Sequence, residues 1–152
     1  MKNSYTYETV LGKITISECK GAITALYFGL SKEGELKRTS LIDKAAIQIE
    51  EYLDGKRKDF DLPISLEGTS FQKRVWTELQ KIPYGKTMTY SQIASAIGSP
   101  KAVRAVGGAN NKNPISIIIP CHRVIGSDGS LTGYAGGLKI KEKLLQLEKG
   151  ID

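Results

Sequence analysis

Apolar and polar residues alternate along the first thirty positions with the period of two that is typical of β-strands. The alternation covers residues 5–9 and 14–16, and a mainly apolar run at residues 22–28 follows it. Short turns containing glycine separate these segments. The pattern predicts an antiparallel meander of three strands.

The period changes to that of a helix over residues 40–54, and Gly55 stands where a C-terminal cap belongs. Residues 60–66 predict one more strand. Glu67-Gly68 then marks an expected boundary between two domains, residues 1–68 and 69–152.

Helical patterns dominate after residue 69. Capping boxes at residues 69–72 and 89–92 each predict the start of a helix. A third helix is predicted over residues 101–109, with Ser99 as its N-cap and Pro100 at its first position. Two short helices joined by a glycine turn are typical of a helix-turn-helix.

This third helix consists mostly of small residues and carries one long side chain, that of Arg104. Helices that read the major groove usually need long polar side chains. A helix of small residues suits close approach to a backbone or a shallow groove better. Tight packing against another helix is the alternative interpretation.

The remaining chain has a strand-like run at residues 115–119, a glycine-rich loop at residues 126–137 and a last helix at residues 138–149. In that helix, Ile140, Leu144 and Leu147 are expected to be buried. The whole pattern predicts an α+β protein.

Charge is distributed unevenly along the chain. Residues 1–68 carry 10 Lys and Arg against 11 Asp and Glu, a net charge of −1, whereas residues 69–152 carry 12 against 5, a net charge of +7. Such asymmetry favours a polyanionic partner such as nucleic acid, although a solvated basic surface also explains it. No apolar stretch is long enough to cross a bilayer and the first residues lack the apolar core of a signal peptide, so a cytoplasmic protein with no membrane partner is expected.

The candidate chemistry centres on Cys121, which His122 and Arg123 follow directly. A free thiol ionises with a pKa of about 8.5, so a nucleophilic cysteine needs a neighbouring base or positive charge. This order of residues supplies both, provided that a turn brings thiol and imidazole together. A buried structural cysteine beside a surface histidine is the alternative, and Glu148 is by itself most simply an exposed glutamate.

Metal chemistry is not expected. The chain has one histidine and two distant cysteines, which match no metal-ligand spacing. We therefore expect no metal and no cofactor, and we interpret Cys19 as inert packing within a strand.

Several segments of the C-terminal half resemble the O6-alkylguanine-DNA alkyltransferases. The resemblance extends from Phe71 to Glu148. Its motifs stand in the family's order and comprise Ile82-Pro83-Tyr84-Gly85, Thr89-Tyr90, residues 104–110, Asn113-Pro114, residues 120–124 and residues 133–138.

This resemblance implies a ribonuclease-H-like N-terminal domain and a mainly helical C-terminal domain with a winged-helix-like helix-turn-helix. It implies a monomer that binds double-stranded DNA through the minor groove and flips O6-alkylguanine, mainly O6-methylguanine, out of the duplex. O4-methylthymine is a further candidate substrate, and the sequence does not decide whether it is repaired. The alkyl group would then pass irreversibly to the protein's own Cys121 in a single turnover. By resemblance the protein is a DNA-repair enzyme, a methylated-DNA–protein-cysteine methyltransferase.

Roles for individual residues follow from the resemblance alone. Cys121 is the acceptor, His122 the base that acts through a water molecule, and Glu148 the partner of that histidine. Asn113 braces the turn, and Tyr90 crowds the target phosphate and helps to protonate the departing guanine. DNA contacts are implied for Arg104, which replaces the flipped base, and for Tyr90, Ala102, Gly107, Ala109 and Arg123.

The base pocket is implied at Tyr134, Ala135, Val124, Asn110 and Gly136. Some family members have serine where this chain has Ala135, so only the backbone N–H serves there. Two other functions stay open from the residues themselves. One is a cysteine hydrolase that turns over on Cys121 and His122, and the other is a DNA-binding regulator without enzymatic activity.

Overall fold

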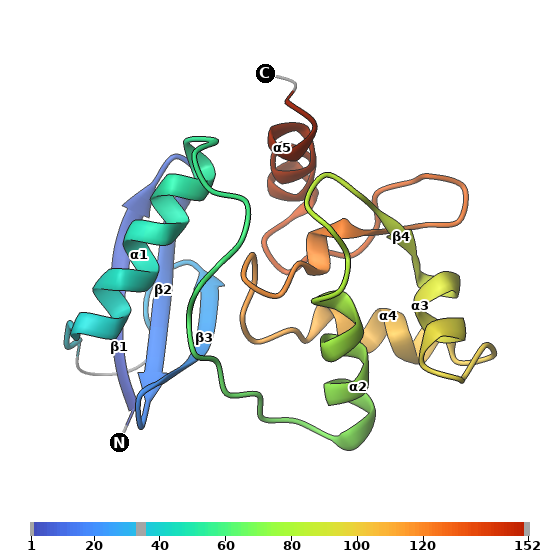
Figure 1. The fold of residues 1–152 in the computed structure, drawn as a ribbon, viewed down its shortest axis with the longest axis horizontal. Helices are drawn as coiled ribbons and strands as arrows, with labels where there is room; N and C mark the ends of the chain where they lie inside the picture. Colours follow the sequence, from blue (N-terminus) through green and yellow to red (C-terminus); the bar gives the residue numbers. More distant parts are fainter. Residues whose placement is uncertain (1, 33–35, 151–152) are drawn as a thin grey trace. The chain divides into compact units, whose positions relative to one another are not determined.

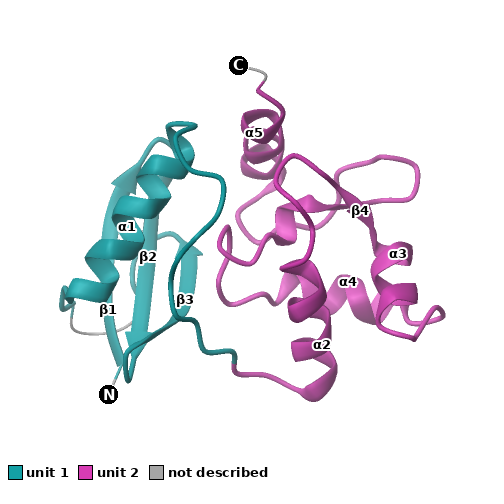
Figure 2. Ribbon diagram, viewed as in Figure 1, with its two compact units in different colours: residues 1–66 teal, residues 67–152 magenta. Residues whose placement is uncertain are grey.

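The computed structural model describes residues 2–32 and 36–150, which divide into two compact units, residues 1–66 and 67–152 (Figure 2). The division falls two residues before the boundary predicted from the sequence. Within the described residues, no helix combines the length and the apolar character that a membrane span requires.

The first unit contains the predicted meander. β1 (Lys2–Thr9), β2 (Gly12–Cys19) and β3 (Ala22–Phe28) form an antiparallel sheet in the order β1-β2-β3. The central strand is buried along most of its length, and Ser4 and Ser17 on neighbouring strands share a buried hydrogen bond of 2.7 Å. The alternation along the chain therefore predicted this sheet correctly.

One helix, α1 (Ser40–Leu53), packs on this sheet and contacts all three strands (Figure 1). Thr39 caps its first turn by accepting a hydrogen bond from the Ile42 backbone, as expected of a threonine at this position. The core of this unit is mainly aliphatic, with Tyr52 of α1 also fully buried, and its aliphatic members include Ile14, Ile16, Ile23, Leu26, Ile42 and Ile49.

The strand predicted over residues 60–66 is wrong. The segment makes a single parallel bridge to β3, in which Ile23 donates to the Pro63 carbonyl at 2.8 Å and Ser65 donates to the Ile23 carbonyl at 2.9 Å. Pro63 has no N–H group to continue a ladder. The amide side chain of Gln48 instead bonds both backbone groups of Asp61, at 3.2 and 2.9 Å, which holds the segment against α1.

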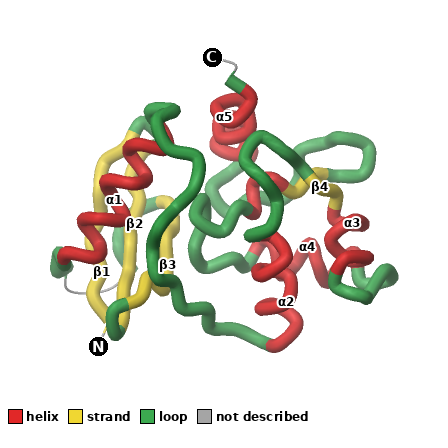
Figure 3. Tube along the Cα trace, viewed as in Figure 1, coloured by secondary structure: helices red, strands yellow, loops and turns green. Residues whose placement is uncertain are grey.

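The second unit is built mainly from helices and loops (Figure 3). Both predicted capping boxes are present, with Thr69 and Gln72 at the start of α2 (Ser70–Leu79) and Thr89 and Gln92 at the start of α3 (Tyr90–Ala96). α4 (Val103–Asn111) packs against both helices, and the Trp76 indole donates to the Ala109 carbonyl at 2.8 Å in the interior. α3 and α4 form the predicted helix-turn-helix.

The start predicted for the third helix is wrong by two residues. α4 begins at Val103, and Ala102 donates to the Ser99 carbonyl at 2.9 Å across Pro100 and Lys101. Proline favours the second position of such a β-turn. Ser99 therefore starts a turn that precedes the helix and does not cap the helix itself.

The strand predicted over residues 115–119 is also wrong. Ile117 has a φ of 71°, which folds this run into a compact turn with one bridge between Ser116 and Ile119. Short strands do occur nearby, where β4 (Met88–Thr89) pairs in parallel with β5 (Val124–Ile125), a pairing that the sequence pattern did not predict.

The last helix, α5 (Leu138–Lys149), follows the predicted bounds. Its buried face differs from the prediction, because Ile140 and Leu147 are only half-buried. The buried residues are Lys141, Leu144, Leu145 and Glu148. Two charged side chains therefore lie on the inner face of this helix, where the pattern predicted only aliphatic ones.

Candidate active site

Cys121 opens a single turn of 3₁₀-helix, η1 (Cys121–Arg123), and its side chain is buried. The turn is closed by a hydrogen bond of 3.0 Å from the Arg123 backbone to the Pro120 carbonyl. A 3₁₀ turn advances about a third of a rotation for each residue. The extended geometry that would point the Cys121 and His122 side chains to opposite faces is therefore absent from this segment.

Asn113 holds the approach to this turn. Its Nδ2 donates to the Ile119 carbonyl at 2.8 Å, and its Oδ1 accepts from the Ile115 backbone at 3.0 Å. The Asn113 side chain also hydrogen-bonds the Cys121 thiol, which lowers the pKa of that thiol. Asn113 thus links the backbone on both sides of Ile117, in the segment that leads to Cys121.

His122 is fully buried and meets the carboxylate of Glu148, with Nε2 2.7 Å from Oε2. A carboxylate accepts hydrogen bonds, so this contact places the ring hydrogen on Nε2 and leaves the lone pair on Nδ1. Burial lowers the pKa of His122, and Glu148 only partly opposes this effect. The ring is therefore a neutral imidazole, which is the form that accepts a proton.

Glu148 is held by further donors besides the histidine. Arg123 donates from Nε to Oε1 at 2.8 Å and from Nη2 to Oε2 at 3.0 Å, and the Gly85 backbone donates to Oε1 at 3.1 Å. A bidentate guanidinium is the strongest common partner of a carboxylate. The interpretation of Glu148 as an exposed glutamate is therefore wrong.

Arg123 is not placed to contact DNA as predicted. Its guanidinium is buried, and besides the two bonds to Glu148 it donates from Nη1 to the Ile82 carbonyl at 2.7 Å. The Cζ atom of Arg123 also lies 5.7 Å from the ring centre of Tyr84. Through these bonds the arginine joins Glu148, near the end of α5, to the loop after α2.

Burial raises the pKa of the Cys121 thiol to about 11. Three polar neighbours oppose this rise, in the order Asn113 by a hydrogen bond, Lys141 by its positive charge and Ser116 by a hydrogen bond. The isolated thiol is therefore a weak nucleophile at neutral pH, and its reactivity depends on these neighbours and on a base.

Three residues of the predicted pocket are buried in this unit. Tyr134 is buried, Asn110 is buried and donates to the Cys121 carbonyl at 3.4 Å, and Val124 is buried within β5. Ala135 is exposed and Gly136 is half-exposed. The last two residues belong to the glycine-rich loop that precedes α5.

The residues predicted to contact DNA differ in their exposure. Arg104 is exposed, Ala102 and Gly107 are half-exposed, and the Tyr90 ring passes about 4 Å from where a Cβ on Gly107 would lie. The hydroxyl of Tyr90 donates to the Thr132 carbonyl at 2.9 Å. Ala109 is buried, so its side chain is not on the surface as predicted.

Sequence reasoning missed two residues here, Lys141 and Thr132. Lys141 is buried and donates from Nζ to the Thr132 carbonyl at 2.8 Å, which is the same oxygen that accepts the Tyr90 hydroxyl. One signal was present in the sequence. Lys141 stands seven residues before Glu148, which is close to two helical turns and therefore on one face.

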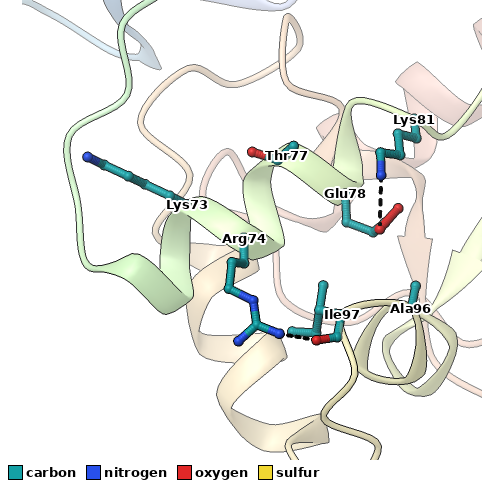
Figure 4. A pocket seen from close by; sticks show the side chains of 7 residues that line it. All are labelled: Lys73, Arg74, Thr77, Glu78, Lys81, Ala96 and Ile97. Atoms are coloured by element: carbon teal, nitrogen blue, oxygen red, sulfur yellow. Dashed lines mark hydrogen bonds and ion pairs between the residues drawn. The ribbon is translucent and has the colours of Figure 1, made fainter.

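Within the described residues, no group of three His, Cys, Asp or Glu side chains could hold a metal ion. A separate basic hollow lies between α2 and the end of α3, where Arg74 bonds the Ile97 carbonyl and Lys81 pairs with Glu78 at 3.5 Å (Figure 4). Its lining includes none of the residues predicted for the site.

The fold and the buried array of Cys121, His122, Glu148 and Arg123 define a protein with a thiol acceptor beside a helix-turn-helix. Residues 70–150 match the family model of the DNA-binding domain of 6-O-methylguanine DNA methyltransferase, and residues 4–66 match the model of its ribonuclease-like domain. The chain belongs to the 6-O-methylguanine DNA methyltransferase family.

Individual relatives agree with this assignment. The constitutive methylated-DNA–protein-cysteine methyltransferase of Bacillus subtilis is 47% identical, covering 95% of this chain and 93% of that protein. The methylated-DNA–protein-cysteine methyltransferase of Methanosarcina barkeri is 65% identical over 106 residues, covering 70% of this chain and 67% of that protein. The crystal structure of Mycobacterium tuberculosis OGT in complex with DNA has a TM-score of 0.91 at 43% identity, covering 97% of this chain and 93% of that one. The mixed α and β architecture predicted from the sequence is thereby confirmed.

Proposed function

We propose that this protein repairs O6-alkylguanine in double-stranded DNA by transferring the alkyl group to its own Cys121. The observation that carries the proposal is the buried chain of contacts from His122 through Glu148 to Arg123, set beside that thiol. Family membership supplies the reaction class, and this geometry supplies an acceptor and a base.

The reaction begins with removal of the thiol proton. The proton passes to Nδ1 of His122 through a water molecule, and the imidazolium is stabilised by the Glu148 carboxylate at 2.7 Å. The thiolate then attacks the alkyl carbon, so that an S–C bond forms while the bond from that carbon to guanine O6 breaks. The guanine leaves with the electron pair and takes up one proton.

A thioether is stable to water, so nothing regenerates Cys121. Each molecule therefore acts once. This stoichiometry separates transfer from hydrolysis, in which a cysteine intermediate would be cleaved and the enzyme would turn over many times.

Tyr90 and the loop residues serve the departing guanine in this proposal. The Tyr90 hydroxyl exchanges its bond to the Thr132 carbonyl for one to the extruded nucleotide and assists its protonation. Tyr134 forms a wall of the base pocket, and the exposed Ala135 offers its backbone N–H to guanine O6.

DNA binding is assigned to α4. Its small residues allow the helix to approach the minor groove closely, and the exposed Arg104 enters the base stack in place of the flipped nucleotide. We further propose that the protein acts as a monomer, that its first unit is of the ribonuclease-H-like type, and that α3 and α4 belong to a winged-helix-like arrangement.

The test is a mass measurement on the modified peptide. The protein is incubated with a duplex containing O6-methylguanine, and the peptide that holds Cys121 is analysed. Transfer predicts a gain of one CH₂ equivalent, at most one per protein, which is lost in Cys121→Ser and retained in Cys19→Ser. Tight binding without an adduct would favour a regulator, and loss of methyl from more than one equivalent of DNA would favour a hydrolase.

A further inference from the structure

The basic hollow of the second unit follows from the spacing of polar residues along α2. Lys73, Thr77 and Lys81 stand four residues apart, so their side chains form one row on the helix and the turn after it. The buried residues of α2, among them Val75 and Leu79, lie on the opposite side of the helix. Figure 4 shows that the side chains around the hollow come from this row and from the end of α3. The row is therefore a feature of the outer surface of the second unit.

The basic hollow carries more positive than negative charge. Lys73, Arg74 and Lys81 are exposed, and Glu78 is the one carboxylate among the described residues that line the hollow. Glu78 pairs with Lys81 at 3.5 Å, and the Lys81 side chain is 68% exposed, so water weakens this pair. No ion pair joins Lys73 or Arg74 to a carboxylate in the part of the chain that the structure describes. Two positive charges of the hollow thus have no counter-charge.

Arg74 makes the end of α3 compatible with an anion. Its Nη2 donates to the carbonyl of Ile97, which is the residue at the C-cap of α3. The last carbonyl groups of a helix carry partial negative charge, which repels an anion. The guanidinium offsets this charge, and it has further N–H groups that can donate to a ligand. The end of α3 therefore presents a cation to the hollow.

The basic hollow adjoins the helix-turn-helix. Ile97 ends α3, and residues 98–102 lead directly into α4, on which Arg104 is exposed. α2 packs against both α3 and α4 within the second unit, so the hollow is fixed relative to these two helices. The cations of the hollow thus stand beside the elements to which DNA binding is assigned.

The spacing of these cations suits a chain of phosphates. Lys73 and Lys81 are eight residues apart, which is about 12 Å along a helix axis. Each strand of duplex DNA carries one phosphate charge for roughly every 3.4 Å of the axis, so the two lysines can bind different phosphates of one backbone. Residues 69–152, which include the hollow, carry 12 Lys and Arg against 5 Asp and Glu, a net charge of +7. An extended polyanion fits this row better than one small anion, because a small anion cannot span it.

We propose that the basic hollow is a second contact with the DNA backbone, in which Lys73, Arg74 and Lys81 bind phosphates that flank the nucleotide addressed by α4. The inference rests on the proposed function, because it takes duplex DNA as the partner. Contacts to phosphate carry no information about sequence, and they fix the position of a protein on the duplex. The hollow therefore adds affinity and holds the helix-turn-helix in place, without distinguishing a lesion from an ordinary base.

The experiment measures the dissociation constant for duplex DNA at several salt concentrations. Cys121→Ser provides the background, so that no alkyl group is transferred during the measurement. The test variant combines Lys73→Gln and Lys81→Gln, which removes two charges and leaves the bond between α2 and α3 intact. The matched control combines Lys139→Gln and Lys143→Gln, which removes two charges from the exposed face of α5. Each protein is measured on two duplexes that differ only in having guanine or O6-methylguanine at one position.

Each lost phosphate contact reduces the slope of log Kd against log salt concentration by about 0.9, so the test variant should reduce it by roughly two. At about 0.1 M salt its affinity should fall roughly ten- to hundredfold, by the same factor on both duplexes. The control should change the slope by less than about 0.5, because it removes no phosphate contact. Glu78→Gln should tighten binding about two- to threefold, because it removes a negative charge from the hollow and releases Lys81.

Equal slopes for the test and control variants would overturn the inference, and so would a loss confined to the duplex with O6-methylguanine. Weaker binding by Glu78→Gln would also count against it. Thermal melting confirms that the variants are folded, and Lys73→Gln alone, with an expected reduction of about 0.9, carries the test if the double variant is not.

Methylation of the unsubstituted protein by O6-methylguanine DNA is measured separately. Failure of this reaction would refute the proposed function. A protein that becomes methylated, but whose test variant binds DNA as the control does, would refute the role of the basic hollow alone. The two failures are therefore distinguishable.

Discussion

The Arg123 guanidinium donates hydrogen bonds to both oxygens of the Glu148 carboxylate, with Nε 2.8 Å from Oε1 and Nη2 3.0 Å from Oε2. Both side chains are buried, so the carboxylate is oriented toward His122 before any substrate arrives. The residue after the histidine thus fixes the partner of that histidine, and a contiguous stretch of chain supplies acceptor, base and anchor.

Removal of Arg123 should destabilise the fold. Arg123→Met leaves the Glu148 charge buried without its main partner, and we expect the free energy of unfolding to fall by about 3–5 kcal/mol. Urea unfolding measures the change. Arg104→Met is the matched control, because Arg104 is exposed and its loss should alter stability by no more than about 0.5 kcal/mol. Equal and small changes for the two variants would place Arg123 on the surface after all.

Acid should weaken the fold through His122. The folded-state pKa lies below the ordinary value of 6.5, chiefly because of burial. As the pH falls below 6.5, His122 therefore becomes protonated in the unfolded chain before it becomes protonated in the folded protein. The contribution of neutral His122 to the free energy of unfolding is therefore complete above pH 6.5. It declines as the pH falls toward the folded-state pKa, by at most about 1.4 kcal/mol per pH unit.

Urea unfolding at several pH values between 7.5 and 5 measures this slope. His122 is the one histidine in the chain, so His122→Gln removes the group that titrates in this window. The variant should show a much flatter dependence, whatever its absolute stability. A slope that survives the substitution would contradict a neutral His122 in the folded protein.

Arg104 should matter for duplex substrates and not for free bases. Extrusion of a nucleotide costs a few kcal/mol, and a side chain that fills the gap recovers part of this. Arg104→Ala should slow transfer from duplex O6-methylguanine by roughly tenfold or more, while reaction with the free base O6-benzylguanine stays nearly unchanged. Lys101→Ala serves as a control for a general loss of positive charge. Equal losses on duplex and free base would refute the role.

Local signals account for the elements that the sequence predicted correctly. The capping boxes at Thr69 and Thr89 are determined by residues three positions apart, and the meander follows from alternation and glycine turns. The strand expected at residues 60–66 failed because Pro63 interrupts the ladder, leaving one bridge to Ile23. The conformation of that segment therefore depends on a contact between residues far apart in the sequence, which the local pattern does not record.

The site was only partly visible in the sequence. Cys121 and His122 stood out by adjacency, whereas Glu148 was identified by resemblance and looked like a surface residue. The DNA contact predicted for Arg123 came from the resemblance, and no pattern pointed to Lys141. Arginine and lysine side chains are mostly exposed in proteins, so the burial of both was not expected. Burial of both arises from contacts between distant segments, which no local pattern records.

Backbone strain at Ile117, in the turn before Cys121, can be tested by comparing glycine and alanine variants at Ile117 and at Ile119. Ile117 is buried with a φ of 71°, a conformation that disfavours residues with a Cβ by roughly 1–2 kcal/mol. Ile117→Gly should therefore be more stable than Ile117→Ala by about 1 kcal/mol, although both lose the buried side chain. Ile119 is equally buried and has no positive φ, so there the alanine variant should be the more stable by a similar amount. Urea unfolding of the four variants decides the matter, and the same order at both positions would show that Ile117 is not strained.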